Sequence, residues 1–219
     1  MIQVEHVCKQ YTNHHHTVHA VNDVSFSVAP NERVGIAGGS GSGKSTLLRL
    51  IAMLEKPTSG TLRLFGQDVT SIQNHRDIYR SLQMMFQNPL AIIPPRMNLE
   101  AFMLEPYINY GLMDEASAKE DICKWIQHVD LPESIVQKYP HEVSGGQLQR
   151  VVLARIMLMH PKLVLFDEPT SALDAVNQKL VLDLLQKLHQ EQPFGYVFVS
   201  HDIGLLQAVT DRIMVMKDG

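Results

Sequence analysis

The chain has 219 residues, of which 45% are hydrophobic and 19% are charged, and its formal net charge is −4. This length suits a single domain with a substantial core and an inserted subdomain. The acidic balance argues against a bulk nucleic-acid binder, which usually carries a basic excess. Cys8 and Cys123 match no metal or redox spacing, so we interpret them as reduced thiols.

The N-terminal stretch MIQVEHVCKQY lacks the basic-then-apolar pattern of a signal peptide. No apolar run reaches the roughly 20 residues that a membrane-spanning helix needs. Arg155 interrupts the best candidate, VVLARIMLM. We therefore expect a cytosolic chain whose connection to any membrane runs through a partner.

Period-two patterns and short apolar runs predict strands at 1–9, 21–28, 33–39, 162–169, 196–202 and 212–219. Helical patterns outside the central region occupy 44–54 and 177–191. The first two strands alternate apolar and polar residues, which is typical of half-buried antiparallel strands. The run Leu163 to Phe166 is typical of a strand buried on both faces, as in parallel sheets. These elements predict a three-layer α/β fold with a mainly parallel sheet and an N-terminal antiparallel β part.

The central region, from about 88 to 159, shows little strand character. Helical patterns cover 114–129 and 147–159, and a short helix is expected at 131–139, stopped before Pro140. We predict one domain with a core at 1–87 and 160–219 and an inserted helical subdomain at about 88–159. The final Asp218-Gly219 is a hairpin-turn signal, so we expect the natural chain to continue past residue 219.

The sequence GGSGSGKST fits the phosphate-loop pattern G-x-x-x-x-G-K-[ST] and lies between a predicted strand and a predicted helix. In such loops backbone N–H groups surround phosphate oxygens, Lys44 reaches the β- and γ-phosphates, and the Ser45 hydroxyl ligates Mg²⁺. The flanking elements argue against a flexible Gly/Ser linker. The predicted nucleotide-binding residues are Gly38, Gly39, Ser40, Gly41, Ser42, Gly43, Lys44, Ser45 and Thr46.

Two acids close the buried strand in LVLFDE. Asp167 is predicted to hold Mg²⁺, and Glu168 to orient and deprotonate the attacking water. Acids at strand ends are commonly just solvated, so the pair alone is a weak signal. Its combination with the phosphate loop favours the catalytic interpretation.

Four further motifs follow one another at family-like spacing: FQNP at 86–89, VSGGQ at 143–147, SALD at 171–174 and VSHD at 199–202. Together with the phosphate loop and the acidic strand, they resemble the ATP-binding subunit of an ABC transporter over essentially all 219 residues. The resemblance implies a P-loop NTPase core and an ATPase that uses ATP and Mg²⁺. It also implies that two such domains pack head to tail.

The head-to-tail pair explains why the VSGGQ motif places glycines at a helix start, as a phosphate-binding loop does, but has no lysine to contact a phosphate. By resemblance, Ser144, Gly145, Gly146 and Gln147 face the γ-phosphate held by the partner's phosphate loop. Alone, a Ser-Gly-Gly stretch before a helix is commonly an ordinary loop.

The remaining motifs take roles by the same match. Gln87 is implied to contact Mg²⁺ and the attacking water, and His201 to contact the γ-phosphate and hold Glu168 in register. Asp174 belongs to the D-loop beside the nucleotide. Tyr11 resembles the aromatic residue that stacks on adenine, although an ordinary edge-strand tyrosine looks the same.

The stretch from Lys138 to Gln178 is most similar to the di- and oligopeptide/nickel import branch. Departures from that branch's usual pattern are Pro95, Gly39 and Val143, none of which removes a catalytic group. The branch implies integral membrane permeases, an extracytoplasmic substrate-binding protein and a second ATP-binding subunit, either a different ATPase or a second copy. It also implies a peripheral position on the cytoplasmic face of the inner membrane and no nucleic acid.

The alternative function is a non-transport ABC ATPase in a soluble complex. Such proteins in chromosome maintenance carry long coiled coils between the phosphate loop and the family's signature motif, which corresponds to VSGGQ at 143–147 here. Those in translation carry two ATPase domains in one chain. Neither feature occurs here.

The transported substrate stays open at this level: nickel, a metal chelate, or a di- or oligopeptide. The segment NHHHTVH at 13–19 is expected to form a loop, in which His14, His15, His16 and His19 are either nickel ligands or ordinary polar surface residues.

Overall fold

The computed structural model describes residues 1–13 and 16–219. They divide into two compact units. The first holds 1–84, 162–168 and 193–219, and the second holds 85–161 and 169–192. The second unit therefore differs from the expected insertion at 88–159 by also including 169–192. Among the described residues, no helix is long and apolar enough to cross a lipid bilayer.

The strands are β1 (Ile2–Asn13), β2 (His16–Val28), β3 (Arg33–Ala37), β4 (Ser59–Leu64), β5 (Gln67–Asp68), β6 (Leu82–Met85), β7 (Leu163–Asp167), β8 (Gly195–Ser200) and β9 (Arg212–Val215). The α-helices are α1 (Lys44–Ile51), α2 (His75–Ser81), α3 (Leu99–Tyr110), α4 (Glu115–His128), α5 (Gly145–Met157), α6 (Ala175–Glu191) and α7 (Ile203–Val209). Short 3₁₀ helices are η1 (Pro89–Ala91), η2 (Glu133–Gln137) and η3 (Pro140–Glu142). The segment predicted as a short helix before Pro140 is thus the 3₁₀ helix η2.

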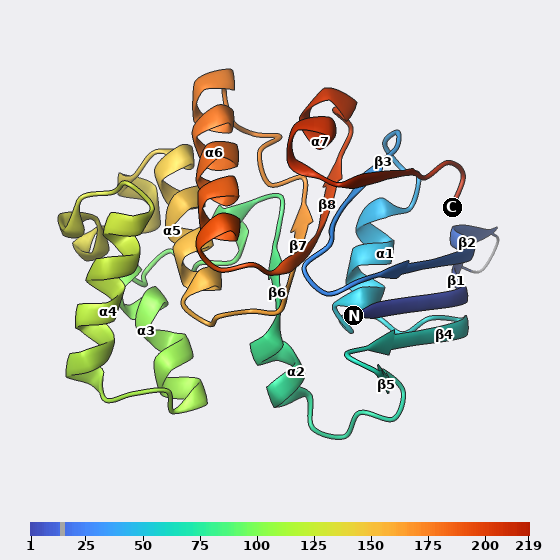
Figure 1. The fold of residues 1–219 in the computed structure, drawn as a ribbon, viewed down its shortest axis with the longest axis horizontal. Coiled ribbons are helices and arrows are strands. Elements are labelled where there is room, and N and C mark those ends of the chain that lie inside the picture. The colour runs from blue at the N-terminus through green and yellow to red at the C-terminus, as the bar shows by residue number, and fades with distance from the viewer. Residues whose placement is uncertain (14–15) are drawn as a thin grey trace. The chain divides into compact units, whose positions relative to one another are not determined.

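One sheet has the order β6-β7-β8-β3-β9, and the pairs β7–β8, β8–β3 and β3–β9 are parallel. Every residue of β7 and β8 is buried, as expected for strands covered on both faces. This confirms the prediction of a mainly parallel sheet. In Figure 1, β3 leads through a loop directly into α1.

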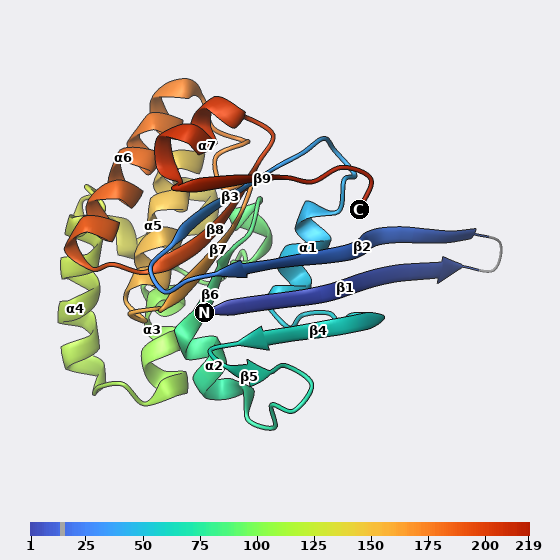
Figure 2. The ribbon, with the colours of Figure 1, turned by 45° about the vertical axis from the view of Figure 1, so that its right-hand side comes forward.

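The second sheet has the order β2-β1-β4-β5, with antiparallel pairing between neighbours. Figure 2 shows β1 and β2 as two long strands side by side. The buried positions of β1 switch from even numbers, Ile2 and Val4, to Val7. A register irregularity lies between Val4 and Val7, and His6 there has a φ of 52°. A bulge of this kind shifts the strand by one residue, so the inward face changes parity.

The predicted loop at 13–19 is wrong in its second half, because β2 begins at His16. His14 and His15 lie outside the described residues. His16 pairs with Asn13, and His19 pairs with Gln10. Residues three apart on a strand point to opposite faces, so His16 and His19 cannot converge on one metal ion.

The second unit is built from helices, as Figure 1 shows for α3, α4, α5 and α6. Asp114 caps α4 by accepting a hydrogen bond from the backbone N–H of Ser117 at 3.1 Å, which fits the acidic helix start expected from the sequence. The expected helix at 147–159 is α5, which begins two residues earlier, at Gly145.

Candidate nucleotide-binding and hydrolysis site

The loop between β3 and α1 has the geometry of a phosphate cradle. Its last glycine, Gly43, caps α1 with a φ of 98°, and a Cβ there would lie 2.0 Å from the carbonyl oxygen of Ala20. Only glycine fits that position. The first backbone N–H groups of α1 have no acceptor within the helix, and together with the helix dipole they favour an anion.

Lys44 is 5% exposed, and its Nζ donates hydrogen bonds to the carbonyl oxygens of Gly38 and Gly39, both at 2.8 Å. A buried ammonium whose hydrogen bonds go to neutral carbonyl oxygens is stabilised further by an anion, and a phosphate supplies one. The Ser42 Oγ atom is also buried without a hydrogen-bond partner in the described parts of the chain. Both observations fit a phosphate group in this loop.

Ser45 and Asp167 come together from positions 122 residues apart. The Ser45 hydroxyl donates to Asp167 Oδ1 at 2.8 Å, and Asp167 is 7% exposed at the end of β7. Burial raises the pKa of the Asp167 carboxyl above its ordinary value, and the hydrogen bond from Ser45 opposes that rise. Hydroxyl and carboxylate oxygens are ligands that Mg²⁺ prefers, so this pair fits a Mg²⁺ site.

Glu168 follows Asp167 in an unusual backbone conformation, with a φ of 46°. Its N–H donates to the carbonyl oxygen of Val199 at 3.1 Å, which ties the residue to β8. Left-handed backbone in a non-glycine residue is uncommon and is concentrated at functional sites. The turn leaves the Glu168 side chain 3.4 Å from His201, measured from Oε2 to Nδ1. The first unit thus holds the phosphate loop, Asp167, Glu168 and His201 together.

Gln87, the signature and Asp174 belong to the second unit. Gln87 Nε2 donates to Ser171 Oγ at 3.4 Å, so the FQNP and SALD motifs are in contact. Ser171 belongs to a motif quoted from the sequence, but nothing in the sequence suggested that it contacts Gln87.

The signature forms the start of α5 through a reciprocal cap. The Gln147 N–H donates to Ser144 Oγ at 3.3 Å, and the Ser144 N–H donates to Gln147 Oε1 at 3.0 Å. The two side chains predicted to bind nucleotide are therefore used locally. Gly146 packs against α6, because a Cβ there would lie 2.6 Å from Asn177 Oδ1, whereas a Cβ on Gly145 would meet only Leu173 Cδ2, at 3.8 Å.

Asp174 has a comparable local role at the start of α6. It accepts hydrogen bonds from the N–H of Asn177 at 2.9 Å and from Asn177 Nδ2 at 2.7 Å. These bonds, the backbone one first, lower the pKa of the Asp174 carboxyl below its ordinary value. No role was predicted for Asn177, although Asp174 before a helical pattern is a recognisable N-cap residue.

Tyr11 lies inside β1, not beyond its end as the sequence suggested, and it is 40% exposed. Its hydroxyl donates to a carboxylate oxygen of Glu55. No sequence motif marks Glu55, which lies 44 positions from Tyr11 along the chain.

Comparison with known proteins gives consistent relatives. A sequence profile described as ABC transporter matches residues 21–171. The di/tripeptide transport ATP-binding protein DppF of Pseudomonas aeruginosa is 40% identical over 94% of this chain, and the oligopeptide transport ATP-binding protein AppF of Bacillus subtilis is 38% identical over 92%. The matched region spans 64% of the first relative's length and 62% of the second's.

Among solved structures, the chain is similar to a dimeric post-hydrolysis state of the ATP-binding cassette MJ0796 bound to ADP and Pi. The TM-score is 0.90 at 30% identity, covering 100% of this chain and 95% of the other. The likeness covers both compact units and confirms the expected P-loop NTPase fold. The chain belongs to the ABC transporter family.

Proposed function

We propose that this chain is the ATP-hydrolysing subunit of an ABC importer for di- or oligopeptides. The observation that carries the proposal is the grouping of Lys44, the Ser45–Asp167 pair and the Glu168–His201 pair in one compact unit. The names of DppF and AppF, a di/tripeptide and an oligopeptide transport ATP-binding protein, support the substrate class.

The chain's own residues have distinct tasks in this proposal. The loop N–H groups and Lys44 bind the β- and γ-phosphates, and Ser45 and Asp167 hold Mg²⁺. Mg²⁺ neutralises charge that develops on the phosphate oxygens. Glu168 accepts the proton of the attacking water, and His201 orients Glu168 from 3.4 Å. Gln87, whose side chain donates a hydrogen bond to Ser171, takes the role that the family resemblance implies for it, contact with Mg²⁺ and the attacking water.

The signature acts on a nucleotide held by a second ATP-binding subunit. Ser144 and Gln147 are engaged with each other, so the open backbone at Gly145 and the helix start are the features offered to that nucleotide. Closure of the pair over ATP is transmitted to membrane permeases, which place the chain on the cytoplasmic face of the membrane. A substrate-binding protein delivers peptide on the other side.

Replacing Glu168 with glutamine tests the hydrolytic assignment. Glu168→Gln keeps the size of the side chain and leaves Asp167 in place, so ATP binding should persist. Hydrolysis by the assembled transporter should fall by roughly 10²–10⁴, the usual contribution of a positioned base. Glu120→Gln, the same change at an exposed position on α4, is the matched control. A Glu168→Gln transporter that hydrolyses ATP at a rate close to wild type would refute the role.

Substrate class is tested by reconstituting the chain with the permeases and binding protein encoded beside it. Di- or oligopeptides should stimulate ATP hydrolysis, while Ni²⁺ should not. If Ni²⁺ alone stimulates ATP hydrolysis, the transported substrate is nickel and the peptide assignment is wrong. Absence of any permease that binds the chain would favour the soluble-complex alternative.

A further inference from the structure

Glu55 lies just beyond the C-terminal end of α1, the helix whose N-terminus follows the phosphate loop. The turn that carries it is fixed, because the N–H groups of Leu54 and Glu55 both donate to the carbonyl oxygen of Arg49, at 2.9 and 3.3 Å. Met53 within this turn has a φ of 55°. The Glu55 backbone is thus anchored to α1.

Three donors surround the Glu55 carboxylate. The Tyr11 hydroxyl donates to Oε2, Lys9 Nζ lies 3.3 Å from Oε2, and Arg49 Nη1 lies 3.8 Å from Oε1. The side chains of Glu55 and Lys9 are only 24% and 16% exposed. A half-buried carboxylate with three partners holds each of them more firmly than an exposed ion pair does.

The protonation states favour the same arrangement. Burial, followed by the bond to Glu55, raises the pKa of the Tyr11 hydroxyl above its ordinary value of 10. Burial acts to raise the pKa of Glu55, but hydrogen bonds from Tyr11 and Lys9 outweigh it, and the pKa falls below its ordinary value of 4.5. At neutral pH a protonated phenol therefore donates to an ionised carboxylate.

Lys9 also restricts access to the ring of Tyr11. Its Nζ lies 5.1 Å from the ring centroid and donates to the carbonyl oxygen of Lys56 at 2.9 Å. A cation over one face of an aromatic ring is attracted to it and leaves the opposite face for stacking.

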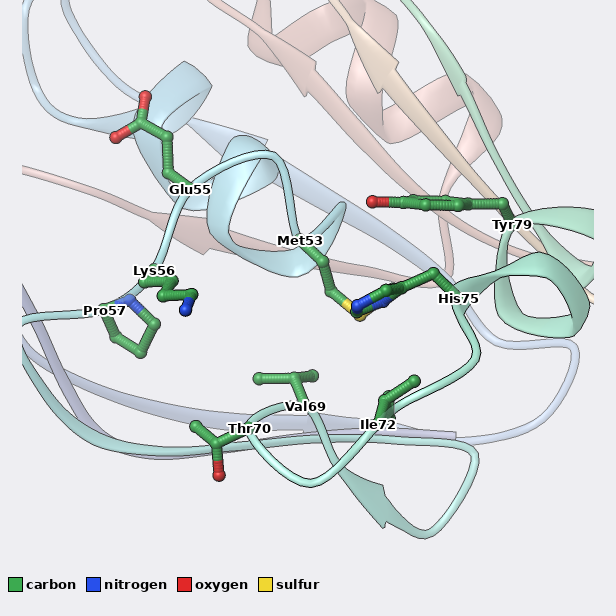
Figure 3. A pocket seen from close by; sticks show the side chains of 9 residues that line it. All are labelled: Met53, Glu55, Lys56, Pro57, Val69, Thr70, Ile72, His75 and Tyr79. Carbon is green, nitrogen blue, oxygen red and sulfur yellow. The ribbon is translucent and has the colours of Figure 1, made fainter.

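The Glu55 carboxylate does not serve the neighbouring pocket. Glu55 borders a pocket of about 230 Å³ with an apolar lining that includes Met53, Val69 and Ile72. Figure 3 shows the Glu55 carboxylate pointing away from these apolar side chains. Within the described residues, the Glu55 carboxylate contacts Tyr11, Lys9 and Arg49.

We propose that Glu55 is a positioning residue for the nucleotide base. It fixes the ring of Tyr11 relative to α1, so that the base subsite and the phosphate subsite are both held in position by the same helix. The inference rests on the proposed ATPase function and on the family resemblance, which implies that Tyr11 stacks on adenine. A helix is a stiff element, and a platform fixed to it keeps a constant spacing from the phosphate loop. Glu55 itself does not touch the base.

The test measures binding of Mg²⁺-ATP, Mg²⁺-GTP and Mg²⁺-tripolyphosphate to the purified chain by calorimetry. Tyr11→Phe and Glu55→Ala should each weaken ATP binding by about three- to tenfold, which is the range expected for the loss of one typical hydrogen bond. Tripolyphosphate, which has no base, should bind all variants equally. The double variant should be no weaker than the more severe single one, because both remove the same contact.

Glu55→Gln keeps an acceptor and the side-chain size, so it should recover most of the affinity lost in Glu55→Ala and guards against a folding defect. Glu5→Ala is the matched control. Glu5 lies on β1, as Tyr11 does, and the change removes its ion pair with Arg63 on β4, so the affinity for ATP should not change. The positioning role is overturned if tripolyphosphate binding falls in parallel with ATP binding, since the cluster would then only support the fold. It is also overturned if ATP binding is unchanged. Failure of the wild-type chain to bind ATP at all would reject the proposed function and this inference with it.

Discussion

Asp167 is suited to binding a cation, but its buried charge lowers the stability of the fold when no cation is bound. The carboxylate is buried, and burial disfavours its charged form. The Ser45 hydroxyl donates a hydrogen bond to it. Sites of this kind are commonly less stable than the rest of the fold, because function sets their composition.

This predicts an unusual pH dependence for the nucleotide-free chain. A pKa raised in the folded state means that the protonated form of Asp167 stabilises the fold. That contribution is present below the ordinary pKa of 3.8 and is lost as pH rises through the raised folded value. Asp167→Asn removes the titration, so at pH 7 the variant should unfold at an equal or higher urea concentration than wild type.

The measurement compares the urea unfolding midpoints of Asp167→Asn and wild type at pH 4 and at pH 7. The difference between variant and wild type should grow with pH. The prediction is wrong if the variant loses stability relative to wild type as the pH rises from 4 to 7. That result would show that the Asp167 charge stabilises the folded chain. Mg²⁺-dependent nucleotide binding should be lost in the same variant.

At the scale of elements, the start of α5 combines two glycines with opposite surroundings. Gly145 has space beside it, while Gly146 contacts Asn177 on α6. The Asn177 side chain is in turn held by Asp174, the cap of α6. The glycine pair therefore has a packing role at one position and an open backbone at the other.

Alanine at each position should separate these roles. Gly146→Ala should destabilise the chain by about 1–3 kcal/mol, because its Cβ would displace Asn177. Gly145→Ala should be neutral or slightly stabilising, since alanine favours helix over glycine. Urea unfolding of the two variants checks this, and Gly146→Ala combined with Asn177→Ala should recover stability. Equal costs at the two positions would contradict the packing role of Gly146.

At the scale of the whole molecule, the proposal requires a second ATP-binding subunit. The Ser144 side chain caps α5 by accepting a hydrogen bond from the N–H of Gln147. Ser144→Arg should therefore leave the affinity of the isolated chain for ATP unchanged, apart from a loss of about 1 kcal/mol in stability from the missing cap. In a Glu168→Gln background, the added bulk should prevent ATP-dependent closure of the pair.

Size-exclusion chromatography with ATP measures closure, and calorimetry measures binding. Ser144→Ala removes the cap without adding bulk, and it should still close. A large loss of ATP affinity in the isolated Ser144→Arg chain would place Ser144 at the same-chain nucleotide and exclude the head-to-tail arrangement.

The family and the fold could be predicted from the sequence because their signals are local. A phosphate loop needs its glycines, lysine and serine within one turn, so nine consecutive residues at 38–46 carry the whole pattern. Buried parallel strands are visible in a sequence as apolar runs, and such runs predicted strands where β7 and β8 lie. In β1 the same reasoning was incomplete, because a bulge between Val4 and Val7 changes the period.

Only the tertiary structure decided which distant residues meet. The Ser45–Asp167 bond spans 122 positions, and the Tyr11–Glu55 bond spans 44, so no local pattern encodes either contact. Strand pairing determined that His16 and His19 face opposite ways, whereas spacing alone suggested that they could converge. The physical reason is common to all three. A sequence specifies which groups are neighbours along the chain, but register, bulges and helix packing decide which groups are neighbours in space.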